Sequence, residues 1–185
     1  MKPFTISPLL SGRPECVKPH EKDCYDLLDR LGISYQRVEL SYFPQEEENL
    51  QKLKEILGTG SIKNLVFQTM RLSPDYYYIL TDGDTRFDTH WFRDTYHVTK
   101  IELVTEEELH DLLHTTPGCV SILELLYDPD CRLNVYIDES LLKRESFRCH
   151  PNDNHTVLKL RTQDVTEKIM PTFSHTFHIM NKGYS

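Results

Sequence analysis

Two apolar stretches joined by a short turn constrain the fold of this chain more than any other feature of its sequence. Residues 62–70 and 76–81 each have the composition of a strand, and Ser73-Pro74-Asp75 between them is typical of a turn. Lys63 and Asn64 therefore stand where the first strand begins. A lysine there is most often a solvated residue that discourages edge pairing. The alternative is a cation held over a cleft.

The remaining elements follow one another without a regular β-α-β alternation. Apolar spacing predicts helices that begin near Glu21 and Pro44, and Thr105 and Asp138 have the positions of helix N-caps. Further strands are predicted at residues 34–40, 101–104, 133–137, 146–149 and 155–160. This order predicts an α+β (irregular α/β) class, with a mixed, mostly antiparallel sheet flanked by helices.

The 185 residues fit a single domain that can bury a full core. We expect an extended arm over residues 1–20, which carry four prolines, the folded domain over 21–170, and a C-terminal tail over 171–185. No apolar run approaches the roughly 20 residues that a membrane helix needs. The sequence has no visible signal peptide, so neither a membrane nor secretion is expected.

The charge and the cysteines narrow the class of partner. A net charge of −8, from 21 basic and 29 acidic residues, argues against a protein that coats long nucleic acids, including DNA. This net charge is still compatible with local contact between a few basic residues and the end of a nucleic acid. Five scattered cysteines without C-x-x-C spacing predict reduced thiols and a cytoplasmic location.

Metal and cysteine chemistry are weakly supported by the sequence. Cys149, His150 and His155 lie close together, but they match no spaced set of zinc ligands, and we expect no metal and no cofactor. Cys149 and His150 are neighbours in a predicted strand, so their side chains point to opposite faces and cannot form a catalytic pair. Cys119 has no activating base that the sequence reveals.

What remains is a set of polar residues at the ends of elements, where a scaffold can hold a site. By residue type alone, His150 has two equally good interpretations. It is either a residue of a functional site or a structural histidine whose hydrogen bonds are satisfied beside a proline turn. Asparagines in such a turn more often cap it. The set comprises Lys63, Asn64, Gly118, Ser121, His150, Asn152 and Asn154.

Several of these residues lie in stretches that resemble one family, the YbaK/prolyl-tRNA-synthetase-associated editing domains. The resemblance covers nearly the whole chain, from about Glu21 to Met170, because five short stretches agree in order and spacing. They are Lys63-Asn64-Leu65-Val66-Phe67, Tyr77-Tyr78-Ile79-Leu80, Pro117-Gly118-Cys119-Val120-Ser121, Val135-Tyr136-Ile137-Asp138 and His150-Pro151-Asn152-Asp153-Asn154. The first and last look most like the stand-alone deacylases that clear alanine from mischarged proline tRNA.

The resemblance implies a trans-editing deacylase that hydrolyses the ester of alanyl-tRNA(Pro) without a cofactor. Lys63 and His150 would be catalytic. The substrate would be bound by Asn64, Gly118, Ser121, Asn152 and Asn154. The implied partner is the acceptor end of mischarged tRNA(Pro), and a synthetase that recruits the chain is a further candidate.

The chain departs from the family pattern at two places. Ile122 stands where the family usually has the proline of Gly-x-x-x-Pro, and His155 follows Asn154 where the family usually has threonine. The first departure favours a second hypothesis, a non-catalytic binding module of the same fold that holds tRNA ends or a partner protein. Lys63 and His150 favour the enzyme. The amino acid removed stays open among alanine, cysteine and serine, since a pocket discriminates by only ~1–3 kcal/mol per methylene.

Overall fold

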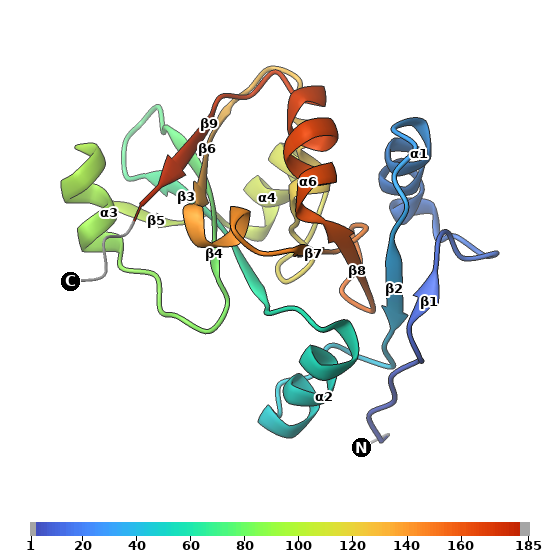
Figure 1. The fold of residues 1–185 in the computed structure, drawn as a ribbon. Coiled ribbons are helices and arrows are strands. Elements are labelled where there is room, and N and C mark those ends of the chain that lie inside the picture. The colour runs from blue at the N-terminus through green and yellow to red at the C-terminus, as the bar shows by residue number, and fades with distance from the viewer. Residues whose placement is uncertain (1–2, 182–185) are drawn as a thin grey trace.

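Strands from distant parts of the chain form two sheets in this computed structural model, which describes residues 3–181 (Figure 1). The smaller sheet is antiparallel, in the order β1 (Leu10–Ser11), β2 (Gln36–Glu39), β8 (Thr156–Arg161) and β7 (Ser146–Cys149). The larger sheet has the order β5 (Ile101–Leu103), β3 (Ile62–Thr69), β4 (Tyr76–Asp82), β6 (Leu133–Asp138) and β9 (Phe177–Met180).

The larger sheet is mixed. β5, β3 and β4 pair antiparallel, whereas β4 with β6 and β6 with β9 pair parallel. The predicted antiparallel hairpin of β3 and β4 is confirmed, with Lys63 opposite Thr81 and Asn64 opposite Leu80. The predicted α+β class with mostly antiparallel pairing is therefore confirmed, although the strands divide between two sheets.

Helices cover these sheets at several places (Figure 1). The N-caps predicted from the sequence are confirmed: Thr105 and Glu108 form a capping box, and the Asp138 side chain accepts a hydrogen bond from the Ser140 amide. The α-helices are α1 (Lys22–Arg30), α2 (Glu47–Leu57), α3 (Thr89–Tyr96), α4 (Glu106–Leu113), α5 (Glu139–Leu142) and α6 (Thr162–Asp164). Single 3₁₀ turns or short helices occupy Pro19–Glu21, Ile122–Tyr127 and Met170–Thr172, and a π-helical turn occupies Val165–Ile169.

Alternation along the strands divides the apolar residues among three cores. Val66 contributes to the main core, which includes residues of both sheets, α1 and α4, whereas its neighbour Phe67 packs with Phe92 of α3. On the smaller sheet, Val157 packs with Leu53 of α2 in a separate cluster. α2 and α3 thus cover outward faces of different sheets.

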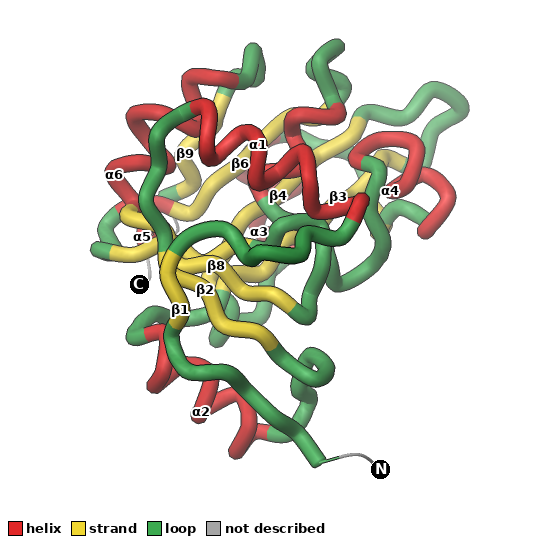
Figure 2. The backbone as a smooth tube through the Cα atoms, turned by 90° about the vertical axis from the view of Figure 1, so that its right-hand side faces the viewer, coloured by secondary structure: helices red, strands yellow, loops and turns green. Residues whose placement is uncertain are grey.

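Both ends of the described chain belong to the sheets. β1 forms the edge of the smaller sheet, so part of the expected arm 1–20 is a paired strand (Figure 2). β9 forms an edge of the larger sheet, so the described part of the expected tail 171–185, residues 171–181, includes a sheet strand.

A buried hydrogen bond between His175 and Asp128 fastens the segment that precedes β9. His175 Nε2 lies 2.9 Å from Asp128 Oδ2, and their side chains are 1% and 0% exposed. Burial alone would raise the pKa of Asp128, but the hydrogen bond from His175 and two backbone amides outweigh it and lower that pKa. Without His175, the Asp128 carboxylate would keep two backbone amides and a 3.4 Å contact with Arg132 Nε.

We expect His175→Ala to lower the free energy of unfolding by about 1.5–3 kcal/mol, because the buried Asp128 carboxylate loses this hydrogen bond. Urea denaturation at pH 7 measures the change. His178→Ala is the matched control, since that ring is exposed and stacks on Tyr136, a contact worth about 0.5–1.5 kcal/mol. Equal losses in the two variants would contradict the role assigned to the buried hydrogen bond.

Candidate functional site

Lys63 and Asn64 point to opposite sides of β3 because successive residues of a strand alternate. The Lys63 ammonium donates a hydrogen bond of 2.7 Å to the Thr85 carbonyl, in the loop that follows β4. Asn64 Oδ1 accepts a hydrogen bond of 2.7 Å from the hydroxyl of Tyr78, which is fully buried in the main core. The cation is therefore held at the loop, and the amide faces inward.

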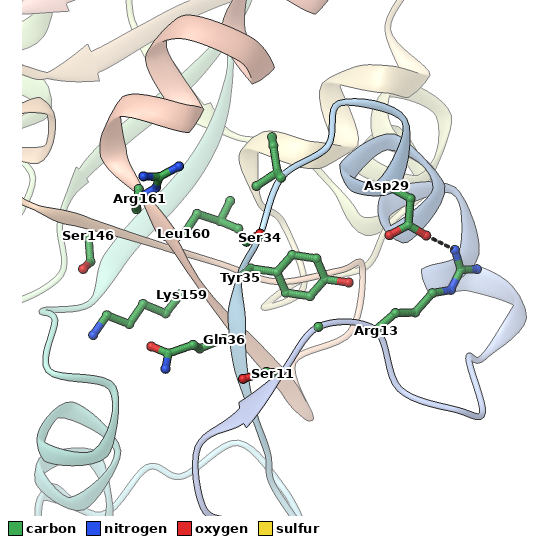
Figure 3. Close-up of a pocket in the computed structure, with 12 residues that line it drawn as sticks. Ser11, Arg13, Asp29, Ser34, Tyr35, Gln36, Ser146, Lys159, Leu160 and Arg161 are labelled. Atoms are coloured by element: carbon green, nitrogen blue, oxygen red, sulfur yellow. Dashed lines mark hydrogen bonds and ion pairs between the residues drawn. The ribbon is translucent and has the colours of Figure 1, made fainter.

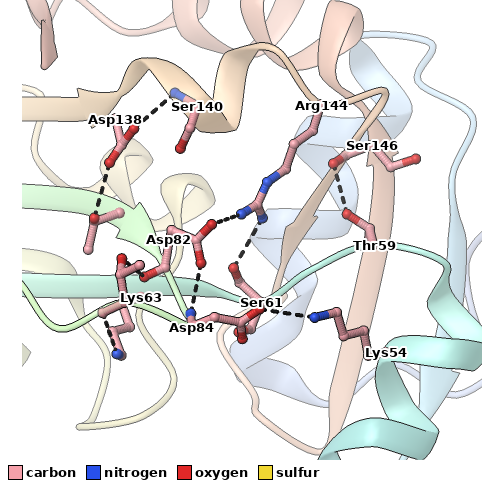
Figure 4. A network of polar contacts seen from close by, with 12 residues as sticks. Lys54, Thr59, Ser61, Lys63, Asp82, Asp84, Asp138, Ser140, Arg144 and Ser146 are labelled. Atoms are coloured by element: carbon pink, nitrogen blue, oxygen red, sulfur yellow. Dashed lines mark hydrogen bonds and ion pairs between the residues drawn. The ribbon is translucent and has the colours of Figure 1, made fainter. Parts of the chain in front are cut away.

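A polar network fixes this loop against the start of β3 (Figure 4). Arg144 donates to Asp82 and to the Ser61 carbonyl, and Lys54 lies 3.0 Å from Asp84. Gly83 is needed between the two aspartates, because a Cβ there would meet the Ser61 side chain at 1.9 Å. These contacts give the Lys63 ammonium a defined position.

His150 is held as a buried, neutral imidazole. It is 8% exposed, its ring centroid lies 6.0 Å from that of Phe43, and its Nδ1 lies 3.2 Å from the Thr156 carbonyl. Burial and the nearby Arg148 charge lower its pKa to about 4. A carbonyl only accepts, so Nδ1 carries the proton and Nε2 offers a lone pair. Within residues 3–181, Nε2 has no hydrogen-bond partner.

The loop 118–121 packs against the turn that contains His150. The Ser121 hydroxyl donates to the His150 carbonyl over 2.7 Å. Gly118 has φ +85°, in the region that favours glycine, and a Cβ there would lie 3.5 Å from the Asn154 amide nitrogen. The Asn152 amide donates to the His114 carbonyl over 3.1 Å. The structure thus brings five predicted residues into one region: Gly118, Ser121, His150, Asn152 and Asn154.

Arg148 connects this region to the loop that holds Lys63. Arg148 and His150 lie two positions apart, so they share a face of β7 and its extension, away from the main-core residue Cys149. The Arg148 charge lowers the pKa of His150, and the charge of Asp84, which neighbours the Lys63 anchor Thr85, raises the pKa of Arg148. No direct contact joins Lys63 and His150.

Asp153 is a polar centre that sequence reasoning missed. Its carboxylate accepts from Lys18, His20 and the backbone and ring of His155, and it is 7% exposed. Burial opposes its charge, but these donors hold its pKa well below the usual range. Its place between two asparagines suggested only a turn. Asp153 ties the N-terminal segment to the His150 turn.

Glu124 supports the same loop from the interior. It forms a capping box with Ser121 and accepts from the Cys24 thiol. Burial raises its pKa to about 8, so the carboxyl is protonated at neutral pH. Ile122, at the position of the family proline, begins the 3₁₀ helix and is fully buried.

The stability of the fold should depend on this proton. Because the folded-state pKa of Glu124 lies above its usual 4.5, the folded protein keeps a proton that the unfolded chain releases. The resulting stabilisation is complete below pH 4.5 and is lost as the pH rises through 8. His150 has the opposite effect, since its pKa falls from 6.5 to about 4, but that effect ends near pH 6.5.

Between pH 6.5 and 8, we therefore expect the free energy of unfolding to fall by about 1–2 kcal/mol more in the natural protein than in Glu124→Gln. Glutamine preserves the shape and the acceptor oxygen but does not titrate. Urea midpoints at both pH values measure the difference. Parallel curves for the two proteins would show that Glu124 is already ionised in the fold.

The larger surface clefts lie beside the predicted site residues rather than on them. The cleft in Figure 3, of about 600 Å³, lies near β1, β2 and the end of α1 and contains the Arg13–Asp29 ion pair. A cleft of about 450 Å³ lies between α2 and Gly83–Asp84, and Arg148 lines it. None of the seven predicted site residues lines either cleft.

The metal ligands considered in the sequence are dispersed. Cys149 belongs to the main core, His150 contacts Phe43, and His155 is hydrogen-bonded to Asp153. Across residues 3–181, no group of three or more His, Cys, Asp or Glu side chains is placed to hold a metal ion. In the same part of the chain, no helix is both long and apolar enough to cross a membrane.

Comparisons with known proteins identify the family of the chain. The model of the aminoacyl-tRNA editing domain family matches residues 46–168, more than half of the chain. The prolyl-tRNA editing protein ProX of Acetoanaerobium sticklandii is 29% identical over 150 residues, which cover 81% of this chain and 90% of that protein.

Two solved structures share the fold. A candidate trans-editing enzyme for prolyl tRNA synthetase matches with a TM-score of 0.63 at 17% identity, over 91% of this chain and 100% of that one. A protein from epitope backbone grafting by computational design matches with a TM-score of 0.64 at 15% identity, over 89% and 97%. The resemblance seen in the sequence motifs is confirmed: the chain belongs to the aminoacyl-tRNA editing domain family and is an aminoacyl-tRNA deacylase.

Proposed function

We propose that this deacylase acts in trans on mischarged tRNA(Pro), with alanyl-tRNA(Pro) as its main substrate. The observation that carries the proposal is His150, a neutral imidazole whose Nε2 is free beside the Gly118 loop. The similarity to a prolyl-tRNA editing protein supports the choice of tRNA. Because tRNA charging takes place in the cytoplasm, we place the activity there.

The proposed reaction is addition of water to the ester carbonyl. His150 Nε2 accepts a proton from the water as its oxygen attacks, and the Lys63 ammonium stabilises the negative charge that develops on the carbonyl oxygen. The bond between the carbonyl carbon and the ribose oxygen then breaks, and that oxygen takes the proton back. The products are the free amino acid and tRNA with its terminal hydroxyl restored.

The other residues position the substrate in this account. The Gly118 backbone and Ser121 form the wall next to His150, and Asn152 and Asn154 hold the turn that carries it. Asn64 acts through Tyr78 from the interior side. The folded domain over 21–170 would contain the whole site, while β1 and β9 complete the sheets.

A substrate panel tests the proposal. Alanyl-, cysteinyl- and seryl-tRNA(Pro) are incubated with the folded protein, and loss of each labelled amino acid is followed. We expect the alanyl ester to be cleaved fastest. Preference for another ester would keep the reaction and overturn the assigned amino acid. Adding prolyl-tRNA synthetase to the same assay tests whether a synthetase recruits the chain.

The second hypothesis, a binding module without turnover, has Ile122 in place of the family proline in its favour, whereas membership of the editing family favours the enzyme. It predicts that the protein binds the acceptor end and protects every ester from hydrolysis. Protection of all three esters by folded protein would decide for that hypothesis.

A further inference from the structure

Arg148 is a buried cation without a counter-ion. It is 5% exposed, and within residues 3–181 its guanidinium makes no hydrogen bond or ion pair. Asp84 is the acidic residue whose charge reaches it. Burial lowers the pKa of Arg148 to about 10, so the group stays charged at neutral pH. Burying an unpaired charge costs folding free energy, which a bound anion would recover.

The guanidinium faces a cleft of suitable size for a nucleotide. The cleft of about 450 Å³ lies between α2, which contributes Glu47, Leu50, Gln51 and Lys54, and the residues Ser61, Gly83 and Asp84. Small-molecule sites typically have volumes of roughly 300–1,000 Å³. Figure 4 shows the Lys54 side chain reaching from α2 toward Ser61 and Asp84. Arg148 is the most buried of the charged residues that line it.

The charges in the cleft do not neutralise Arg148. Asp84 is already paired with Lys54 at 3.0 Å, and Glu47 is exposed on the first turn of α2. Lys159, directly opposite Arg148 on β8, adds a second cation on the same face of the sheet. The cleft therefore lacks one anion next to Arg148.

We propose that Arg148 binds a phosphate of the tRNA acceptor end, the one on the 5′ side of the terminal adenosine. The proposal rests on the proposed function. Arg148 and His150 are two residues apart on one strand face, a separation of roughly 6.6–6.8 Å. A phosphate and the 3′ oxygen of the same nucleotide lie on opposite sides of one ribose. If the ester lies at His150, that phosphate lies near Arg148.

The chemistry of the side chain suits this ligand. A guanidinium presents several N–H donors in a planar fork that matches two oxygens of a phosphate, and it is more weakly hydrated than an ammonium group. One buried arginine is also compatible with the acidic net charge of the chain, because a protein that binds only the end of an RNA needs few phosphate contacts.

Binding of two nucleosides that differ by one phosphate tests the contact directly. Adenosine and adenosine 5′-monophosphate are titrated into the natural protein, Arg148→Met and Arg71→Met. Arg71 is exposed beyond the far end of β3 and receives the same chemical change. We expect the natural protein and Arg71→Met to bind the monophosphate ~10–100-fold more tightly than adenosine. Arg148→Met should bind both equally, with unchanged affinity for adenosine.

Stability separates loss of the contact from misfolding. Because Arg148→Met removes an unpaired buried charge, it should raise the melting temperature while it abolishes the phosphate preference. Arg148→Gln is the second variant and should lose the preference as well. Unfolding of both variants would show that Arg148 supports the fold and would overturn the proposal, as would a phosphate preference that survives in either.

Hydrolysis distinguishes failure of this proposal from failure of the proposed function. For alanyl-tRNA(Pro), Arg148→Met should raise KM ~10–100-fold, and the salt dependence of log KM should fall by about 0.7. Hydrolysis of 2′(3′)-O-alanyladenosine, which has no phosphate, should change much less, because Arg148 then acts only through its charge on His150. An equal loss with both substrates would place Arg148 at the ester and overturn the proposal. A natural protein that cleaves neither ester but prefers the monophosphate would overturn the function and leave the phosphate site.

Discussion

The rate of hydrolysis should not fall near pH 6.5, the pH at which an ordinary histidine gains a proton and stops acting as a base. In the proposed mechanism the neutral form of His150 is active, and burial together with the Arg148 charge lowers its pKa to about 4. We therefore expect kcat/KM to stay level down to about pH 5 and to fall tenfold per pH unit only below about 4. Single-turnover rates from pH 3.5 to 8 measure this profile, with circular dichroism at each pH to confirm the fold.

His150→Gln should lower kcat by ~10²–10⁴ and remove the acid limb, since glutamine cannot accept the proton. His90→Gln is the matched control, because His90 is exposed on α3. His90→Gln should keep both the natural kcat and the decrease in rate below about pH 4. A decrease in rate near pH 6.5 in the natural protein would mean that the general base is another histidine or a solvent-exposed His150.

Lys63→Ala should lower kcat for alanyl-tRNA(Pro) by ~10²–10³ while the fold stays intact. The reason is the defined position of its ammonium, which the Thr85 carbonyl holds at 2.7 Å in a loop fixed by Gly83 and Arg144. A preorganised cation stabilises a developing oxyanion without having to be reoriented during the reaction.

Lys100→Ala is the control for this change, because Lys100 is exposed and lies before β5. It should leave kcat within a factor of two. Unfolding midpoints in urea should agree for the natural protein and both variants. A Lys63→Ala enzyme that retains a third or more of the natural rate would remove Lys63 from the catalytic role.

The sequence predicted local structure well because local structure depends on near neighbours. The hairpin of β3 and β4 follows from two apolar stretches around a Pro-Asp turn, and the capping box at Thr105 follows from a glutamate three residues later. Pairing between distant segments has no such signal. The division into two sheets, and the parallel pairing of β9 with β6, depend on contacts far apart in the chain.

The candidate site shows the same limit. Alternation in β3 already implies that Lys63 and Asn64 face opposite sides, and the structure places them so. The partners of each residue could not be foreseen, since Thr85 and Tyr78 reach them through tertiary packing. Arg148 gave no signal at all, because its importance lies in burial without a partner, which the sequence does not encode locally.

Release of alanine from alanyl-tRNA(Pro) by the folded protein under single-turnover conditions tests the central claim most directly. We expect the natural protein to accelerate hydrolysis well above the buffer rate, and Lys63→Ala and His150→Gln each to abolish most of this acceleration. Hydrolysis at the buffer rate by folded natural protein, for the alanyl, cysteinyl and seryl esters alike, would contradict the central claim.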